Sequence, residues 1–139
     1  MSICGSDSFI IEGSKGKEIY DMIMNSIEKC VEFRDKDYYE YELGTFKGKK
    51  YSIFKTHNND GDIEYWVNVR CDGQYHSGSS FTMKDIEWNN EYLRVKESTC
   101  NSVGSFYTFV IDSKLYEDSG FYYYGWMEQC YGGDRKSVV

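Results

Sequence analysis

Apolar residues follow a helical repeat in the first quarter of the chain. Four of them recur at every fourth position and share one helix face: Ile19, Ile23, Ile27 and Val31. Charged and amide side chains occupy many of the positions between them. The pattern predicts an amphipathic helix over residues 17–34, preceded by a short strand at residues 9–12 and a turn at residues 13–16.

Beyond residue 38 the apolar repeat shortens to two, which is typical of strands with one buried face. The clearest case is the segment from Ile63 to Arg70, in which every second residue up to Val69 is aliphatic or tyrosine. The run Asn58-Asn59-Asp60-Gly61 favours a hairpin turn, since Asn and Gly tolerate positive φ. Strands are expected up to residue 127, and their short connections imply antiparallel neighbours.

Three segments of the second half carry more specific expectations. Residues 71–73 end a strand, and the Gly/Ser-rich residues 77–80 prolong the break. Residues 81–88 and 92–97 are expected to pair as a hairpin. Residues 105–111 are apolar on both faces and are expected to form a central strand.

These elements predict an α+β fold in a single domain, residues 1–139. One N-terminal amphipathic helix packs on a curved, mostly antiparallel sheet of about six or seven strands, because the helix stripe and the sheet face each need an apolar partner. The Gly-rich, polar residues 131–139 are expected to form a loose tail. The chain has 14 Tyr, 8 Phe and 3 Trp, but no Ala or Pro and only three Leu. Aromatic side chains are therefore expected to supply much of the buried area.

Cysteine usage and hydropathy predict a cytoplasmic protein. The five cysteines are an odd number and form no Cys-x-x-Cys pair, unlike the disulfide framework of a small secreted domain. The first residues lack the basic and apolar segments of a signal peptide. No apolar run approaches the roughly 20 residues that span a bilayer. We therefore expect no membrane partner, and a location in the cytoplasm, or in the host cytoplasm if the protein is viral.

Candidate motifs for chemistry are weak. Residues 13–17 read Gly-x-x-Gly-Lys between a strand and a helix, but a P-loop needs four residues between its glycines. Residues 56–67 lack the first and last carboxylates of a calcium loop. His57 and His76 are too few for a Cys/His metal site, although either can act as an acid–base group beside a carboxylate. No catalytic residue, metal or cofactor is therefore predicted.

Charge gives the strongest functional signal. The chain carries 16 basic and 23 acidic residues, a net charge of −7, which argues against direct binding to nucleic acid. Acids interleave with tyrosines in residues 28–42, and a lysine-rich segment follows at residues 46–57. The predicted partner-binding surface consists of these acidic and aromatic residues together with one tryptophan: Glu28, Glu32, Asp35, Asp37, Tyr39, Glu40, Glu42 and Trp66. The alternative is a solvated helix face beside half-buried tyrosines.

The leading hypothesis is a small acidic protein that inhibits or neutralises a partner protein by occupying its basic functional surface. If the partner binds nucleic acid, the carboxylates mimic DNA phosphates. Viral inhibitors of host or defence proteins and toxin-immunity proteins both act in this way, and the abundance of Ile, Lys, Asn and Tyr, typical of an AT-rich genome, favours the viral inhibitor. The competing hypothesis is a pocket in the cupped sheet for a small ligand, a nucleotide or an enzymatic reaction. Its nucleotide version requires Lys15 and Lys17 to converge with the Lys47–Lys55 cluster.

Overall fold

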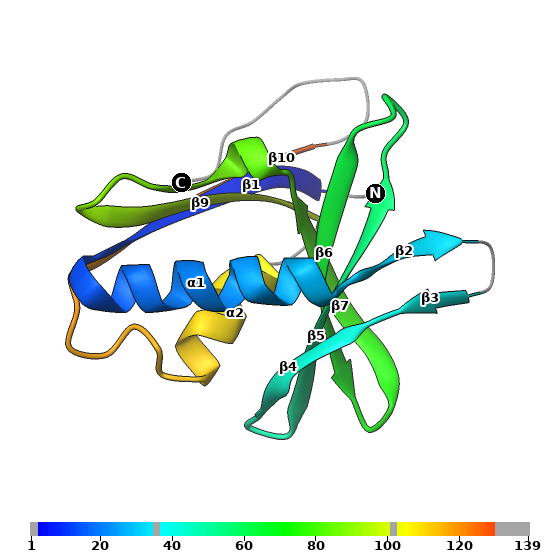
Figure 1. The fold of residues 1–139 in the computed structure, drawn as a ribbon, viewed down its shortest axis with the longest axis horizontal. Coiled ribbons are helices and arrows are strands. Elements are labelled where there is room, and N and C mark those ends of the chain that lie inside the picture. The colour runs from blue at the N-terminus through cyan, green and yellow to red at the C-terminus, as the bar shows by residue number, and fades with distance from the viewer. Residues whose placement is uncertain (1–2, 35–36, 101–102, 130–139) are drawn as a thin grey trace.

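The fold is described from a computed structural model, which places the backbone of residues 3–34, 37–100 and 103–129. Side chains are described for residues 5–30, 40–99 and 103–125, so the expected loose tail lies outside the described residues. The chain forms the helices α1 (Gly13–Lys29) and α2 (Ser105–Asp112) and a 3-10 turn at Met83–Asp85 (Figure 1). The strands are β1 (Ile3–Glu12), β2 (Val31–Arg34), β3 (Asp37–Tyr39), β4 (Tyr41–Phe46), β5 (Lys49–His57), β6 (Ile63–Cys71), β7 (Gln74–Phe81), β8 (Ile86–Trp88), β9 (Tyr92–Cys100) and β10 (Phe121–Gln129).

Within the described residues, ten strands form one sheet that is antiparallel apart from one pairing. Eight strands follow the order β10-β1-β9-β7-β6-β5-β2-β3, while β4 pairs with β5 and β8 pairs with β9. The exception is β2, which runs parallel to β5 with Glu32 beside Lys55. The predicted α+β class and mostly antiparallel sheet are confirmed. The strands outnumber the prediction because β2 and β3 have only four and three residues, too few to show a clear repeat, and because β7 runs through residues predicted as a break.

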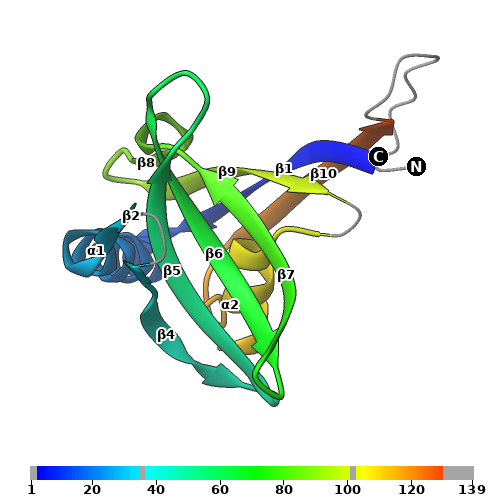
Figure 2. The same cartoon turned by 90° about the vertical axis from the view of Figure 1, so that its right-hand side faces the viewer.

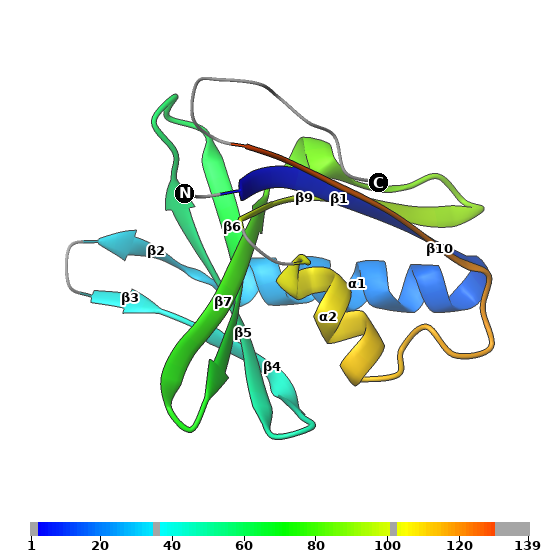
Figure 3. The same cartoon turned by 180° about the vertical axis from the view of Figure 1, so that it is seen from behind.

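Both helices lie on the same side of the sheet. The sheet curves strongly, and α1 and α2 occupy its concave side (Figure 2 and Figure 3). The helix α1 packs against β1, β5, β8 and β9, whereas α2 packs against β6 and β7. The first strand, β1, lies between the last two, β9 and β10. Neither helix in the described part of the chain is long and apolar enough to cross a membrane.

The long helix starts and ends earlier than the predicted range 17–34. It begins at Gly13, so the residues expected to form a turn build its first turn. Gly16 in that turn packs so closely on the backbone of β1 that a side chain would overlap it. The helix ends at Lys29 because Cys30 has extended backbone geometry, with φ of −72° and ψ of 135°, and the next residues pair as β2.

The prediction of a central strand at residues 105–111 is wrong, because this segment forms α2. Phe106, Phe109 and Val110 share one helix face and are buried, at the i, i+3 and i+4 spacing of a helix. The spacing alone cannot assign such a short apolar run to a helix or a strand. The deciding contacts come from distant carboxylates, which accept hydrogen bonds from the first N–H groups of the helix.

The predicted hairpin turn between β5 and β6 is confirmed. Asn58 Oδ1 accepts hydrogen bonds from the backbone N–H groups of Asp60 and Asp62, both at 3.0 Å. The strands β8 and β9 form the second expected hairpin, although β8 covers only residues 86–88. The predicted break at residues 77–80 is wrong, because β7 runs through it and pairs with β6.

Aromatic side chains form the centre of the core, as the composition predicts. Phe106 on α2 contacts Phe9 and Phe81, with ring centroids 5.4 and 5.5 Å apart. Phe109, one turn later, contacts Tyr51 with a centroid distance of 5.5 Å. All of these side chains are buried. The contacts join α2 to β1, β5 and β7, so the aromatic residues connect the helix to distant parts of the sheet.

Ile23 tests the packing of α1, since its side chain is fully buried on the apolar face of the helix. Ile23→Ala is expected to lower the free energy of unfolding by about 2–5 kcal/mol, because it removes buried methyl groups and leaves a cavity. Asn25→Ala, on the exposed face of the same helix, is expected to change it by no more than about 0.5 kcal/mol. Urea unfolding followed by circular dichroism measures both, and equal effects would contradict this packing.

Candidate functional site

The side of β5, β6 and β7 that faces away from the helices carries a polar and aromatic surface. Along β6, Tyr65, Val67 and Val69 point toward the helices and are buried, so Trp66 lies on the opposite side. Figure 2 shows these strands in front of both helices. We call this surface the outer face, and its residues are Glu40, Glu42, Lys50, Ser52, Phe54, Glu64, Trp66, Asn68 and Arg70.

Glu40 is held on the outer face by three side chains. Its Oε1 accepts hydrogen bonds from Ser52 Oγ at 3.1 Å and Asn68 Nδ2 at 3.0 Å, and its Oε2 lies 3.1 Å from Arg70 Nη2. Burial raises the pKa of Glu40, but the hydrogen bonds from Asn68, Arg70 and Ser52 and the charge of Arg70 together lower it below its ordinary value. Glu40 is therefore a negative charge in a fixed position at neutral pH.

Trp66 and Phe54 supply the aromatic part of the outer face. The two residues pair in register on β6 and β5, and both side chains are half-buried. The Trp66 Nε1 group donates a hydrogen bond of 2.9 Å to Glu64 Oε1, which fixes the direction of the indole ring. Two neighbouring aromatic side chains, of which Trp66 is held by a hydrogen bond, offer contact area at a low cost in conformational entropy.

The structure brings Glu40, Glu42 and Trp66 to one face and separates them from Glu28. Glu42 is exposed on β4, and its Oε1 lies 3.6 Å from Lys50 Nζ. Glu28 is exposed on the last turn of α1, which lies on the concave side of the sheet. The predicted surface is therefore divided between the two sides of the sheet.

The rest of the predicted surface belongs to the segment of β2 and β3. The backbone places Glu32 on β2 and Asp37 and Tyr39 on β3, while Asp35 lies between the two strands and outside the described residues. The side chains of the other three also lie outside the described part of the chain. The strand β2 pairs with β5, and both short strands extend away from the helices (Figure 1). This acidic segment therefore borders the strand that carries Phe54.

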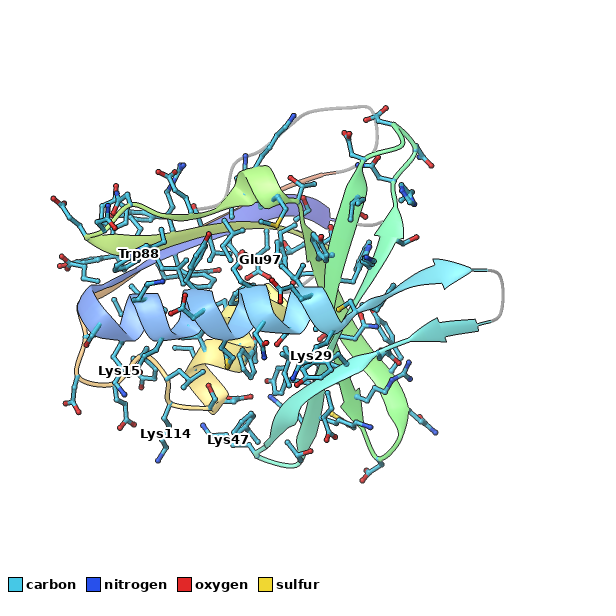
Figure 4. The ribbon with its side chains drawn as sticks, in the orientation of Figure 1. Lys15, Lys29, Lys47, Trp88, Glu97 and Lys114 are labelled. Atoms are coloured by element: carbon cyan, nitrogen blue, oxygen red, sulfur yellow. The ribbon has the colours of Figure 1, made fainter. Side chains whose placement is uncertain are left out.

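A second cluster of acidic side chains lies between the sheet and α2. Glu97 on β9 is 1% exposed and Asp7 on β1 is 3% exposed. Glu97 accepts the N–H groups of Phe106 and Tyr107 at 3.0 and 2.9 Å, and Asp7 Oδ2 accepts that of Gly104 at 2.9 Å. Figure 4 shows Glu97 pointing from β9 toward the helices. The two carboxyl groups thus satisfy N–H groups at the start of α2, which have no acceptor within the helix.

Burial changes the ionisation of both carboxyl groups. Burial and the charge of Asp7 raise the pKa of Glu97 to about 8. Burial also raises the pKa of Asp7, although hydrogen bonds from Gly104 and Tyr123 act in the opposite direction. Glu97 is therefore mostly protonated at neutral pH. Since both groups are closed off from solvent, they support the fold and do not form a surface site.

Four of the lysines that the nucleotide hypothesis requires pair with nearby acids. Lysines of the first turns of α1 contact acids one turn later: Lys15 with Glu18 at 3.8 Å and Lys17 with Asp21 at 2.6 Å. Lys47 and Lys49 instead contact Asp112 at the end of α2, at 3.7 and 3.3 Å. Figure 4 shows Lys15 at the start of α1 and Lys47 beside the turn between β4 and β5. The ion pairs therefore divide these lysines into separate groups.

The two histidines, His57 and His76, are exposed. Within the described residues, no group of three or more His, Cys, Asp or Glu side chains could hold a metal ion. No family model matches the chain, and no curated protein or solved structure is detectably similar to it. Function is therefore inferred from the outer face.

Glu40 makes the free energy of unfolding depend on pH in the acidic range. Its folded pKa is below the ordinary value of 4.5, so its stabilising effect is present above that value and is lost as the pH falls through the folded pKa. Glu40→Gln is expected to lower the free energy of unfolding at neutral pH by about 1 kcal/mol and to reduce the loss of stability between about pH 5 and about pH 3.

Glu42→Gln is the matched control, because the Glu42 side chain is 58% exposed and pairs only at the surface. It is expected to change the free energy of unfolding by less than about 0.5 kcal/mol at either pH. Thermal unfolding at a series of pH values measures both variants. The same acid sensitivity in Glu40→Gln and the unmodified protein would contradict the role of the hydrogen-bonded carboxylate.

Proposed function

We propose that the protein binds a basic surface of a partner protein through the outer face and so blocks that surface. The observation that carries the proposal is the Glu40 carboxylate, which three side chains hold on the same face as half-buried Trp66 and Phe54. Aromatic residues commonly provide most of the binding energy at the centre of an interface, and fixed charges provide specificity. The outer face combines both.

The charge of the chain supports a basic partner. A net charge of −7 attracts a basic protein and increases the association rate at low salt. The same charge repels nucleic acid and anionic membranes. The segment of β2 and β3 borders the outer face, because β2 pairs with β5. Its sequence adds the acids Glu32, Asp35 and Asp37 next to those of the outer face.

A binder of this kind acts as an inhibitor when the covered surface is functional. Viral inhibitors and toxin-immunity proteins both work by occupying a surface in this way. Where the partner binds nucleic acid, Glu40 and Glu42 on neighbouring parts of the outer face take the place of phosphate groups. We favour the inhibitor over the small-ligand hypothesis, because separate ion pairs engage four of the lysines that a nucleotide site requires, Lys15, Lys17, Lys47 and Lys49.

Trp66→Ala is expected to weaken binding to the partner at least about tenfold, because it removes the aromatic anchor from the outer face. The partner is first captured on the immobilised unmodified protein at about 50 mM NaCl and eluted at about 300 mM NaCl, since screening weakens a charge-driven complex. It is then purified, and its affinity for each variant is measured by calorimetry. Circular dichroism verifies that each variant is folded.

Tyr124→Ala is the matched control, because Tyr124 is a 61% exposed aromatic residue on β10, away from the outer face. It is expected to leave the affinity unchanged. A stoichiometric basic partner that loses affinity only in Trp66→Ala supports the proposal. An acidic partner, binding that is insensitive to salt, or equal losses in both variants would contradict it.

A further inference from the structure

The carboxyl groups of Asp7 and Glu97 lie where α2 meets several strands. Glu97 comes from β9 and Asp7 from β1, and together they accept N–H groups at the start of α2. Ser79 on β7 donates a hydrogen bond to Glu97 Oε1, and Tyr123 on β10 donates one of 3.3 Å to Asp7 Oδ2. The pair therefore links the helix to four strands.

The hydrogen bonds around the pair leave one acceptor without a donor. Asp7 Oδ1 is buried and has no hydrogen-bond partner among the described groups, and the two buried carboxyl groups both accept N–H groups from one short segment, residues 104–107. Two ionised carboxylates cannot bond to each other, because neither has a proton to donate. A single proton on the pair supplies the donor and removes one buried negative charge.

We propose that Asp7 and Glu97 hold one proton between them and act as a latch, which fastens the start of α2 to the sheet while the proton is bound. When the proton is lost, the two negative charges repel each other and the attachment of α2 weakens. This latch goes beyond the proposed partner binding, because the pair lies on the concave side of the sheet and the outer face lies on the other side.

The groups that face the pair cannot compensate a second negative charge. Tyr107 from α2 and Tyr123 from β10 remain neutral, because burial and the charge of Asp7 raise the pKa of both. Ser79 from β7 is a neutral donor. Among the described residues, no Lys, Arg or His forms an ion pair with either carboxylate. The start of α2 offers only about half a positive charge, so a second negative charge stays uncompensated.

Close packing prevents the Glu97 carboxylate from moving away when it ionises. Gly104 lies so close that a methyl group in place of its hydrogen would overlap this carboxylate. Ser79, which donates a hydrogen bond to its Oε1, is itself buried. The repulsion therefore acts on the attachment of α2, since the side chain is 1% exposed and is held by hydrogen bonds from Ser79, Phe106 and Tyr107.

The sign of the pH dependence follows from the number of bound protons. Unfolded Glu97 loses its proton near its ordinary pKa of 4.5, whereas in the folded protein its pKa is about 8. Between these values the folded state binds one more proton than the unfolded state, so stability falls as the pH rises and levels off above pH 8. The folding equilibrium constant is expected to decrease by up to about tenfold per pH unit in this window.

Glu97→Gln tests the latch, because the amide has nearly the shape of the protonated carboxyl group and cannot ionise. Urea unfolding is measured for both proteins from about pH 5 to about pH 9. As the pH rises to 8, the folding equilibrium constant of the unmodified protein is expected to fall relative to that of Glu97→Gln, by at most about tenfold per pH unit. Glu91→Gln, at an exposed position before β9, is the control and should follow the unmodified protein. Parallel curves for Glu97→Gln and the unmodified protein would overturn the proposal.

A nuclear magnetic resonance titration observes the latch directly. The Glu97 carboxyl carbon and the Phe106 and Tyr107 amides are expected to titrate together near pH 8, and the two amides to lose protection from hydrogen exchange above it. Asp7→Asn keeps the test decisive if Glu97→Gln does not fold. In that variant the Glu97 midpoint should move down, because the charge of Asp7 is gone. A Glu97 midpoint below about pH 5 in the unmodified protein, or one unchanged in Asp7→Asn, would overturn the latch.

Discussion

The first N–H groups of α2 need acceptors from outside the helix, and the carboxyl groups of Asp7 and Glu97 provide them. An eight-residue helix without a side-chain cap of its own is not stable alone, so these contacts decide whether residues 105–112 are helical. The Glu97 carboxylate also constrains the residues around it. Residue 104 must be glycine to leave space for this carboxylate, and Ser79 donates a hydrogen bond to it. Once the helix is attached in this way, its aromatic residues close the core between distant strands.

The periodic parts of the chain could be predicted from sequence, and the parts defined by long-range contacts could not. The repeat of α1 spans several turns, but its ends depend on the close approach of Gly16 to β1 and on the pairing of β2. Glu40 and Trp66 were recognisable from charge and residue type, whereas the side chains that hold Glu40 belong to other strands. For the buried pair, the one sequence signal is that Glu97 continues the alternation of Leu93 and Val95, and nothing in the sequence links it to Asp7.

The two sides of the sheet use carboxyl groups in opposite ways. On the outer face, Glu40 lies beside Arg70, and hydrogen-bond donors and a positive charge favour its ionised form. On the concave side, Glu97 lies beside another acid in a buried position, which favours its neutral form. The acidic composition therefore includes both a surface charge suited to recognition and an internal group suited to holding the fold together. Net charge alone does not distinguish these environments.

The position of β1 between β9 and β10 has a consequence for how the chain folds during synthesis. Asp7 and its partners Gly104 and Tyr123 are 97 and 116 residues apart in the sequence. Such contacts form late, because a long loop must close before they contribute to stability. As the ribosome makes the chain from its N-terminal end, β1 waits with Phe9 and Ile11 unburied until β9 and β10 have emerged. During synthesis this strand therefore exposes apolar side chains until the last strands of the sheet are available.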